Sequence, residues 1–384
     1  MTLNSVQALR GIAALMVALY HVFLNEQVGM TAAGSTDTSA LLDLTRNGLA
    51  GVDLFFVISG FIMVHVTASR DRGALASADF LMSRFSRIYP LWWLFSLGFL
   101  VIILAGTGSL IPPAYEVPAD QAPAYLIRSF LLWPQAHLPY IVVGWTLIHE
   151  MYFYLVFALF LLAPARHLPL LLAGWLVIVL LGALSGLASG GDVIGLILHP
   201  LTFEFIAGAA AGLLITRGVR LLALPALVLG GTLFIGAVLW IDLGTAPLGE
   251  AWMRVLVFGL PSAVLIYGLV NLETGKGWHF PRALVRLGDM SYALYLCHVI
   301  VYFLALKVFE LATGLTTSLG LPGWIGAIFD LGAAGPVDNL AFVLTSLLGA
   351  WVCAAIAHQL FERPSMRWLS QRRQAVMASL RTRS

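Results

Sequence analysis

The chain has 384 residues, of which 60% are hydrophobic and only 10% are charged. Its net charge of +2 says nothing about nucleic acid, which is not among the expected partners. A soluble domain carries about 25% charged residues because its surface faces water, so this composition excludes a soluble globular protein. The apolar runs are continuous over about 20 residues, as membrane-spanning helices require, which excludes the short alternating strands of an outer-membrane barrel.

Ten apolar segments are predicted to be membrane-spanning helices, and the first lacks the cleavage site of a signal peptide. They cover about 7–27, 48–67, 86–106, 140–163, 168–189, 193–216, 220–241, 252–270, 290–312 and 338–360. Residues 122–134 are too short to cross a bilayer and are expected at its interface. Residues 313–337 are expected to form a long loop or a re-entrant segment. The sequence therefore predicts one all-α, polytopic transmembrane domain over residues 1–384.

The basic residues are distributed unevenly around these spans. If the N-terminus is cytoplasmic, 17 of the 21 Lys and Arg residues lie on the cytoplasmic side. They are Arg10, Arg70, Arg72, Arg84, Arg87, Arg166, Arg217, Arg220, Lys276, Arg282, Arg286, Arg363, Arg367, Arg372, Arg373, Arg381 and Arg383. Because cytoplasmic loops are enriched in Lys and Arg, we expect both termini in the cytoplasm and a basic cytoplasmic tail at about 363–384.

The first predicted span, LRGIAALMVALYH, carries two ionisable residues on one face. Arg10 and His21 are three helical turns apart, which separates them by about 16 Å along the axis. A cation at the cytoplasmic mouth and a titratable base deeper in the membrane would suit an anionic ligand and a proton transfer. The alternative is a structural histidine bonded to another helix, with Arg10 as a positive-inside anchor.

The second and third predicted spans add further polar positions. In GVDLFFVISGF, Asp53 enters from the outer side, and Ser59 and Gly60 allow another backbone or a thin ligand to approach closely. In SRFSRIYPLWW, Arg84 and Arg87 lie one turn apart at the cytoplasmic edge, a spacing that suits phosphate binding. Helix packing at Gly60 and positive-inside anchoring by the two arginines are the alternatives.

The fourth predicted span, GWTLIHEMYFYLVF, runs in the opposite direction to the first. It places Glu150 at about the depth of His21, where the carboxylate could support the imidazole as a catalytic dyad or form a structural ion pair with it. Trp145, Tyr152 and Tyr154 could form an aromatic wall, although aromatic residues near the ends of spans more often lie at the membrane interface.

The ninth and tenth predicted spans also contain polar motifs. Ser291, Tyr295, His298 and Tyr302 form one polar stripe along the ninth span. Such a stripe must face protein or a cavity rather than lipid. The last span ends in HQLFERP, where Pro364 is expected to stop the helix.

Taken together, these segments resemble the motifs of the acyltransferase 3 family of integral membrane acyltransferases. The matching segments are, in order, LRGIAALMVALYH, GVDLFFVISGF, RFSRIYPLWW, GWTLIHEMYFY, FEFIAGAAAG, LGDMSYALYLCH and FERP. Each motif alone is weak, but seven in this order cover nearly the whole chain and are specific. The family usually has ten spans in this orientation. Without a fused extracytoplasmic domain, the chain looks like the short members that modify exopolysaccharide, O-antigen or small lipid-linked molecules.

The resemblance implies transfer of an acyl group, usually acetyl, from cytoplasmic acetyl-CoA to a hydroxyl of an extracytoplasmic or lipid-linked glycan at the bacterial inner membrane. It implies His21 as the catalytic histidine, Arg10 as its paired basic residue and Glu150 as the acidic residue of the fourth-span motif. Arg84 and Arg87 are expected near the donor. The expected substrate-binding positions are Asp53, Ser59, Trp145, Tyr292 and His298.

The chemistry expected from these residues needs no metal, and the sequence shows no ligand cluster with metal spacing. His21, supported by Glu150, would remove the proton of the acceptor hydroxyl, and an acyl-His21 intermediate is a second possible mechanism. The competing class is a proton-coupled transporter or flippase, in which intramembrane His and Glu relay protons. Inverted repeats would favour a transporter, and the sequence shows none. Consumption of acetyl-CoA distinguishes the two classes.

Overall fold

The computed structural model describes residues 3–39, 41–187, 193–241, 251–332 and 339–381. Within these ranges the protein is all-α, and nine helical segments are long and apolar enough to cross a membrane. A tenth apolar helix, α6 (Gly144–Phe160), is shorter. These ten segments correspond one to one to the predicted spans, which confirms the polytopic helical fold. The orientation of the termini stays a prediction.

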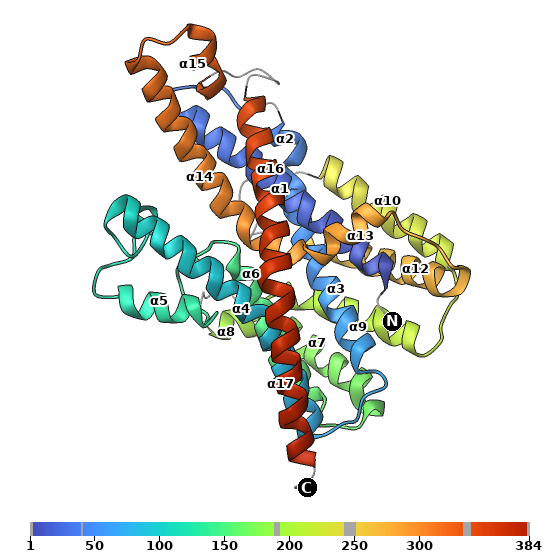
Figure 1. Ribbon diagram of the computed structural model, residues 1–384. Helices are drawn as coiled ribbons and strands as arrows, with labels where there is room; N and C mark the ends of the chain where they lie inside the picture. The colour runs from blue at the N-terminus through green and yellow to red at the C-terminus, as the bar shows by residue number, and fades with distance from the viewer. Residues whose placement is uncertain (1–2, 40, 188–192, 242–250, 333–338, 382–384) are drawn as a thin grey trace.

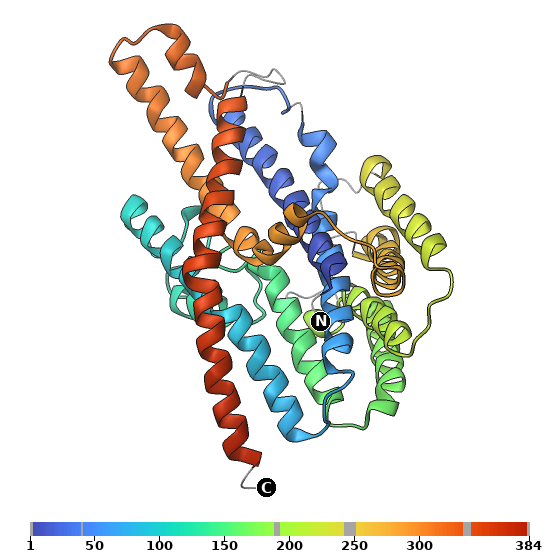
Figure 2. The same ribbon diagram turned by 45° about the vertical axis from the view of Figure 1, so that its right-hand side comes forward.

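The helices follow one another along the chain. Figures 1 and 2 show their arrangement in two views. Their bounds are α1 (Asn4–Ala32), α2 (Leu42–Thr45), α3 (Ala50–Thr67), α4 (Ala74–Thr107), α5 (Ala122–Phe130), α6 (Gly144–Phe160), α7 (Leu168–Leu184), α8 (Val193–Ile197), α9 (Thr202–Thr216), α10 (Ala223–Trp240), α11 (Ala251–Arg254), α12 (Leu260–Lys276), α13 (Arg282–Asp289), α14 (Ser291–Ser318), α15 (Gly323–Phe329), α16 (Leu340–Ala357) and α17 (Arg363–Arg381).

Three boundaries differ from the sequence prediction. α4 begins at Ala74, three turns before the expected start at residue 86, because the polar segment before the membrane continues the same helix. The sixth span is divided into α8 and α9 at Pro200, which has no N–H for a helical hydrogen bond. The region 313–337 is helical in α15 and at the end of α14, whereas residues 333–337 lie outside the described ranges.

Pro364 does not stop the last helix, contrary to expectation. A π-helical turn at His358–Glu362 joins α16 directly to α17. A π turn is wider than an α turn, and it precedes the proline, whose ring would clash within a regular α-helix. The basic segment predicted as a tail is therefore a helix as far as Arg381, and residues 382–384 lie outside the described ranges.

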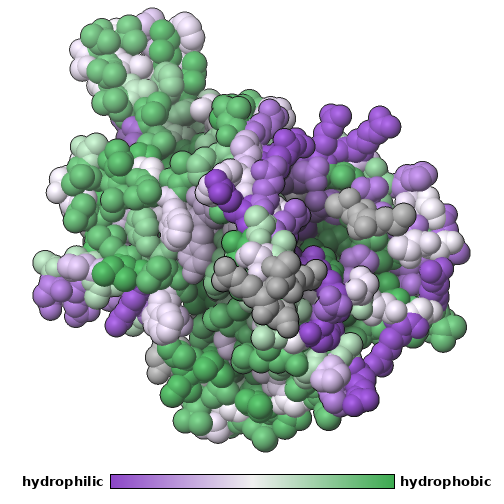
Figure 3. Space-filling view, turned by 60° about the horizontal axis from the view of Figure 1, so that its bottom comes forward, coloured by the Kyte–Doolittle hydropathy of each residue, from purple (hydrophilic) through white to green (hydrophobic). Residues whose placement is uncertain are grey.

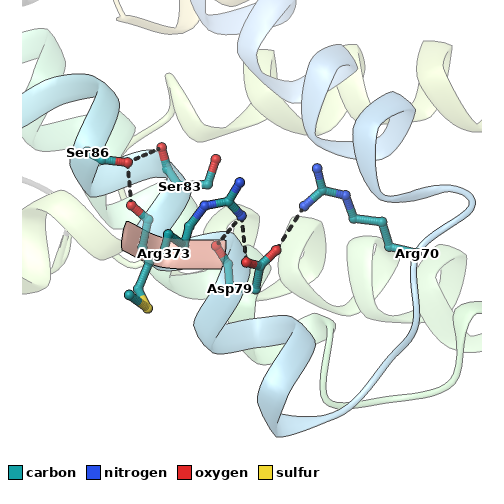
Figure 4. Close-up of polar contacts among 6 residues, drawn as sticks. Arg70, Asp79, Ser83, Ser86 and Arg373 are labelled. Atoms are coloured by element: carbon teal, nitrogen blue, oxygen red, sulfur yellow. Dashed lines mark hydrogen bonds and ion pairs between the residues drawn. The ribbon is translucent and has the colours of Figure 1, made fainter. Parts of the chain in front are cut away.

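α17 packs along the N-terminal part of α4, as Figures 1 and 2 show. Asp79 of α4 accepts hydrogen bonds from two arginines (Figure 4). Arg373 of α17 lies 2.5 Å from one carboxylate oxygen, and Arg70, which precedes α4, lies 3.3 Å from the other. One carboxylate therefore joins the last helix to α4, which carries Arg84 and Arg87.

α3 and α9 pack closely because each offers a glycine at the crossing. A Cβ atom on Gly60 would collide with the carbonyl oxygen of Phe205, and one on Gly208 would collide with that of Val57. The two backbones therefore touch directly, as small residues allow in membrane helices. This contact gives Gly60 a packing role and fixes the adjacent Ser59.

The outer surface of the bundle is largely apolar. Leu170, Leu184 and Trp240 are each more than 70% exposed, at 72%, 73% and 78% respectively. Viewed from the end where α17 ends, hydrophobic residues cover much of the perimeter and hydrophilic residues gather on one part of the face (Figure 3). Exposed apolar surface on this scale requires lipid around it.

Candidate active site

A cavity of about 70 Å³ lies among α1, α3, α4, α6 and α14. It brings together six of the residues selected from the sequence, although they are spread over almost 300 positions. These are Arg10, Ser59, Arg84, Arg87, Glu150 and Tyr292. Its wall also includes Tyr154, from the proposed aromatic wall, and Ser291 and Tyr295, from the polar stripe of the ninth span. Thr146, which the sequence analysis did not select, lines it as well.

Three arginines from two helices give the cavity its positive charge. Arg84 is only 9% exposed, and its guanidinium lies over the rings of Phe80 and Tyr154, at 5.5 and 5.8 Å from their centroids. Its buried Nε has no hydrogen-bond partner among the residues that the structure describes. Arg10 is equally buried and donates to Gln7 over 3.3 Å. A buried cation with an unused donor is costly, and an anionic ligand would remove that cost.

Tyr292 holds this wall of the cavity in position. Its hydroxyl donates to the carbonyl oxygen of Ile88 over 2.8 Å, which ties α14 to α4 one residue after Arg87. Tyr292 also lines the cavity, so it is placed both to position the arginines and to contact a ligand.

Glu150 shares the cavity with the arginines. Its carboxylate accepts a hydrogen bond from Ser59 over 2.9 Å and another from Tyr154, which lies one turn along the same helix. Among the hydrogen bonds of the described residues, none joins Glu150 to His21. The expected direct contact between Glu150 and His21, as a dyad or as an ion pair, is therefore wrong, whereas a catalytic role of Glu150 stays a prediction. Equal depth in the membrane does not specify which way a helix turns its side chains, and α6 packs on α3 and α4 rather than along α1.

His21 lies next to His298 instead. Nδ1 of His21 is 3.3 Å from Nε2 of His298 and 2.9 Å from the carbonyl oxygen of Val17. The Tyr295 ring, which lines the cavity, lies 5.9 Å from the His298 ring. The histidine pair therefore adjoins the arginine-lined cavity across Tyr295. Sequence analysis selected both histidines but did not predict their contact.

Asp53 is placed away from the cavity. It is fully buried, and Arg254 binds it through two hydrogen bonds of 3.0 and 2.7 Å. Sequence analysis missed Arg254. The available signal was that Arg254 is one of only four basic residues outside the cytoplasmic set and lies near the outer side, where Asp53 enters the membrane. The ion pair gives Asp53 a structural partner.

Trp145 also lies outside the cavity wall. Its ring packs edge-on against Phe56 and His149, with centroid distances of 6.2 and 5.8 Å. The His149 ring in turn lies 4.7 Å from that of His199. Trp145 therefore belongs to an aromatic cluster behind Phe56, which does line the cavity.

Comparison with protein families gives the class of this site. The model of a family described as an acyltransferase domain matches residues 3–370. The chain belongs to the acyltransferase 3 family. This confirms the resemblance drawn from the seven motifs, and it makes the protein a multi-pass membrane acyltransferase.

Two curated relatives align with this acyltransferase over most of their length. The exopolysaccharide production protein ExoZ of Rhizobium meliloti (strain 1021) is 30% identical over 326 residues, which cover 83% of this chain and 90% of the relative. Acyltransferase MdmB of Streptomyces mycarofaciens is 28% identical over an alignment of 403 residues, which covers 98% of this chain and 95% of the relative. No solved structure matches the chain significantly.

Proposed function

We propose that this acyltransferase moves an acyl group, in the simplest case acetyl, from cytoplasmic acyl-CoA to a hydroxyl group of an extracytoplasmic or lipid-linked glycan. The proposal rests on one observation. Three arginines lie around one cavity, and the half-buried His21 lies just beyond Tyr295, which forms part of the cavity wall. Its setting is the bacterial inner membrane.

The arginines suit the head of acyl-CoA. CoA carries several phosphates, which cannot enter hydrocarbon, whereas its pantetheine arm is long and thin. Arg10, Arg84 and Arg87 offer planar, permanently charged donors to phosphate, and the unused Nε of Arg84 is available to one more acceptor. The arm would extend past Tyr295 to bring the thioester to His21.

His21 supplies the base. As the acceptor oxygen attacks the thioester carbonyl, the hydroxyl proton passes to the imidazole, the C–O bond forms and the C–S bond breaks. The proton then passes to the departing thiolate, so the products are the ester and free CoA. Direct attack needs a base within hydrogen-bond reach of the acceptor hydroxyl. An acyl-His21 intermediate would be detected as an acylated histidine in the absence of acceptor.

The acceptor class is supported by the relatives. One of them is named for exopolysaccharide production, and a hydroxyl-rich glycan offers the nucleophile that His21 would activate. We expect acceptor selectivity in the segments 107–139 and 313–337, the longest connections on the predicted outer side.

The test is release of CoA thiol by purified protein in detergent, with and without a glycan acceptor, and mass analysis of surface glycans from cells with and without the gene. His21→Ala should lower transfer by about 10²–10⁴-fold while acetyl-CoA still binds. His65→Ala is the matched control, because His65 stacks on Phe61 at the far end of α3 and should stay within about twofold of the wild type. Transport of a glycan without thiol release would favour the transporter class instead.

A further inference from the structure

His298 of α14 faces His21 of α1 inside the bundle. The two ring centroids are 5.0 Å apart, and Nε2 of His298 lies 3.3 Å from Nδ1 of His21. His298 is fully buried, whereas His21 is half-buried. In a catalytic triad, the histidine that reacts is accessible to substrate and the residue that orients it is buried. The exposure of these two histidines suits the same division, with His21 as the reacting residue and His298 as the residue that orients it.

The contacts fix the positions of the protons. Nδ1 of His21 is 2.9 Å from the carbonyl oxygen of Val17, and Nδ1 of His298 is 3.0 Å from that of Leu294. A carbonyl oxygen only accepts hydrogen bonds, so both Nδ1 atoms carry a proton. In the neutral ring, Nε2 of His298 then has a lone pair and accepts from the Nδ1–H of His21, which it shares with Val17.

This arrangement leaves Nε2 of His21 as the basic nitrogen. No hydrogen bond among the described residues uses that atom, and the ring is half-buried rather than enclosed. The His298 ring is held between Tyr295 and Tyr302, with centroid distances of 5.9 and 5.6 Å. The Tyr295 hydroxyl is in turn bonded to Thr146 over 2.9 Å. The orientation of the acceptor nitrogen is therefore fixed by packing.

We propose that His298 is the positioning residue of His21: it holds His21 in the tautomer whose free Nε2 receives the acceptor proton, and it stabilises the imidazolium that forms. The proposal rests on the function proposed above. His298 takes the place that a carboxylate occupies in a Ser-His-Asp triad. A neutral acceptor does this without the cost of a second charge in the membrane interior.

Only one imidazolium, that of His21, forms during the reaction, and each proton can be followed. The acceptor hydroxyl loses its proton to Nε2 of His21 as the new C–O bond forms and the C–S bond breaks. The departing thiolate takes that proton back, which returns His21 to its starting tautomer. His298 keeps its own proton on Nδ1, bonded to Leu294, throughout.

The test compares two substitutions at position 298. His298→Phe keeps a flat ring but removes the acceptor atom, and we expect kcat to fall roughly 10²-fold while KM for acetyl-CoA stays within about twofold. His298→Gln places an amide oxygen near the position of Nε2 and should recover activity to within about tenfold of the wild type. His65→Phe is the control, because it makes the same change of ring at a histidine that stacks on Phe61 and takes no part in the His21–His298 contact.

Three results would overturn the proposal: normal kcat in a folded His298→Phe protein, a loss confined to KM, or a folded His298→Gln protein as inactive as His298→Phe. Nitrogen NMR of ¹⁵N-histidine-labelled protein supplies a readout independent of turnover. His21 should be protonated on Nδ1 in the wild type and should become a tautomer mixture in His298→Phe. A wild type that consumes no acetyl-CoA would refute the proposed donor, whereas a His21 protonated on Nε2 would refute the pairing itself.

Discussion

Ser59 on α3 donates a hydrogen bond of 2.9 Å to the carboxylate of Glu150 on α6, and both residues line the same cavity as the arginines. Glu150 is thereby held among Arg10, Arg84 and Arg87 instead of against His21. Its negative charge lies where an anionic donor head would bind. The Glu150 carboxylate therefore lowers the net positive charge of the cavity.

Replacing Glu150 by Gln tests this placement. The amide oxygen can still accept from Ser59, but one negative charge is removed from the arginine-lined cavity. We expect CoA to bind roughly three- to tenfold more tightly, measured by calorimetry, because a repulsive charge is lost. Ser59→Ala removes the hydrogen bond but keeps the charge and should change CoA binding less. Unchanged CoA binding with a large fall in kcat would return Glu150 to the role of support for His21.

Arg84→Ala and Arg87→Ala test whether the arginines bind the nucleotide end of the donor. Each should weaken acetyl-CoA binding by roughly ten- to a hundredfold, since a charge-assisted phosphate contact contributes about 1.5–3 kcal/mol. A truncated acetyl thioester that lacks the nucleotide should be almost insensitive to the change. Arg367→Ala, at an exposed position on α17, is the control. An equal loss with both donors would assign the arginines to structure.

Asp53→Asn tests the buried ion pair with Arg254. Removing one partner of a buried pair leaves an uncompensated charge and typically costs about 3–5 kcal/mol. We therefore expect a clear fall in thermal stability in detergent, with activity that follows the folded fraction. The double variant Asp53→Leu with Arg254→Met should recover much of the stability. A stable Asp53→Asn protein with a selective rise in KM for the acceptor would support the substrate-binding role expected from the sequence.

Labelling of introduced cysteines tests the topology. The chain has two cysteines, Cys297 and Cys353. In a background in which both are replaced, a membrane-impermeant reagent applied from outside should label Pro118→Cys and Gly332→Cys. It should not label Ala74→Cys or Trp278→Cys. The expectation follows from the 17 of 21 basic residues assigned to the cytoplasmic side. The reverse labelling pattern would place both termini outside.

The sequence was sufficient for the spans because hydropathy alone decides which segments cross a bilayer. It also selected most of the polar cavity wall, since an ionisable residue in a span must face protein or water. It could not pair these residues. Glu150 lies with Ser59, Asp53 with Arg254 and His21 with His298. Each pairing depends on the rotation of one helix about its axis and on which helices are neighbours. The depth of a residue along its span gives no information about either.

The junction at Pro364 has a geometric consequence. α16, the π turn and α17 form one helical segment, and its stretch from Leu340 to Leu380 is 41 residues long. At 1.5 Å per residue it measures about 60 Å, roughly twice the thickness of the hydrocarbon core. A rod perpendicular to the bilayer would therefore have about half of its length beyond the lipid tails, and a tilted one somewhat less. A small change in the tilt of the embedded part would displace the far end of the rod by a larger distance. A spectroscopic probe at that end would therefore report the tilt.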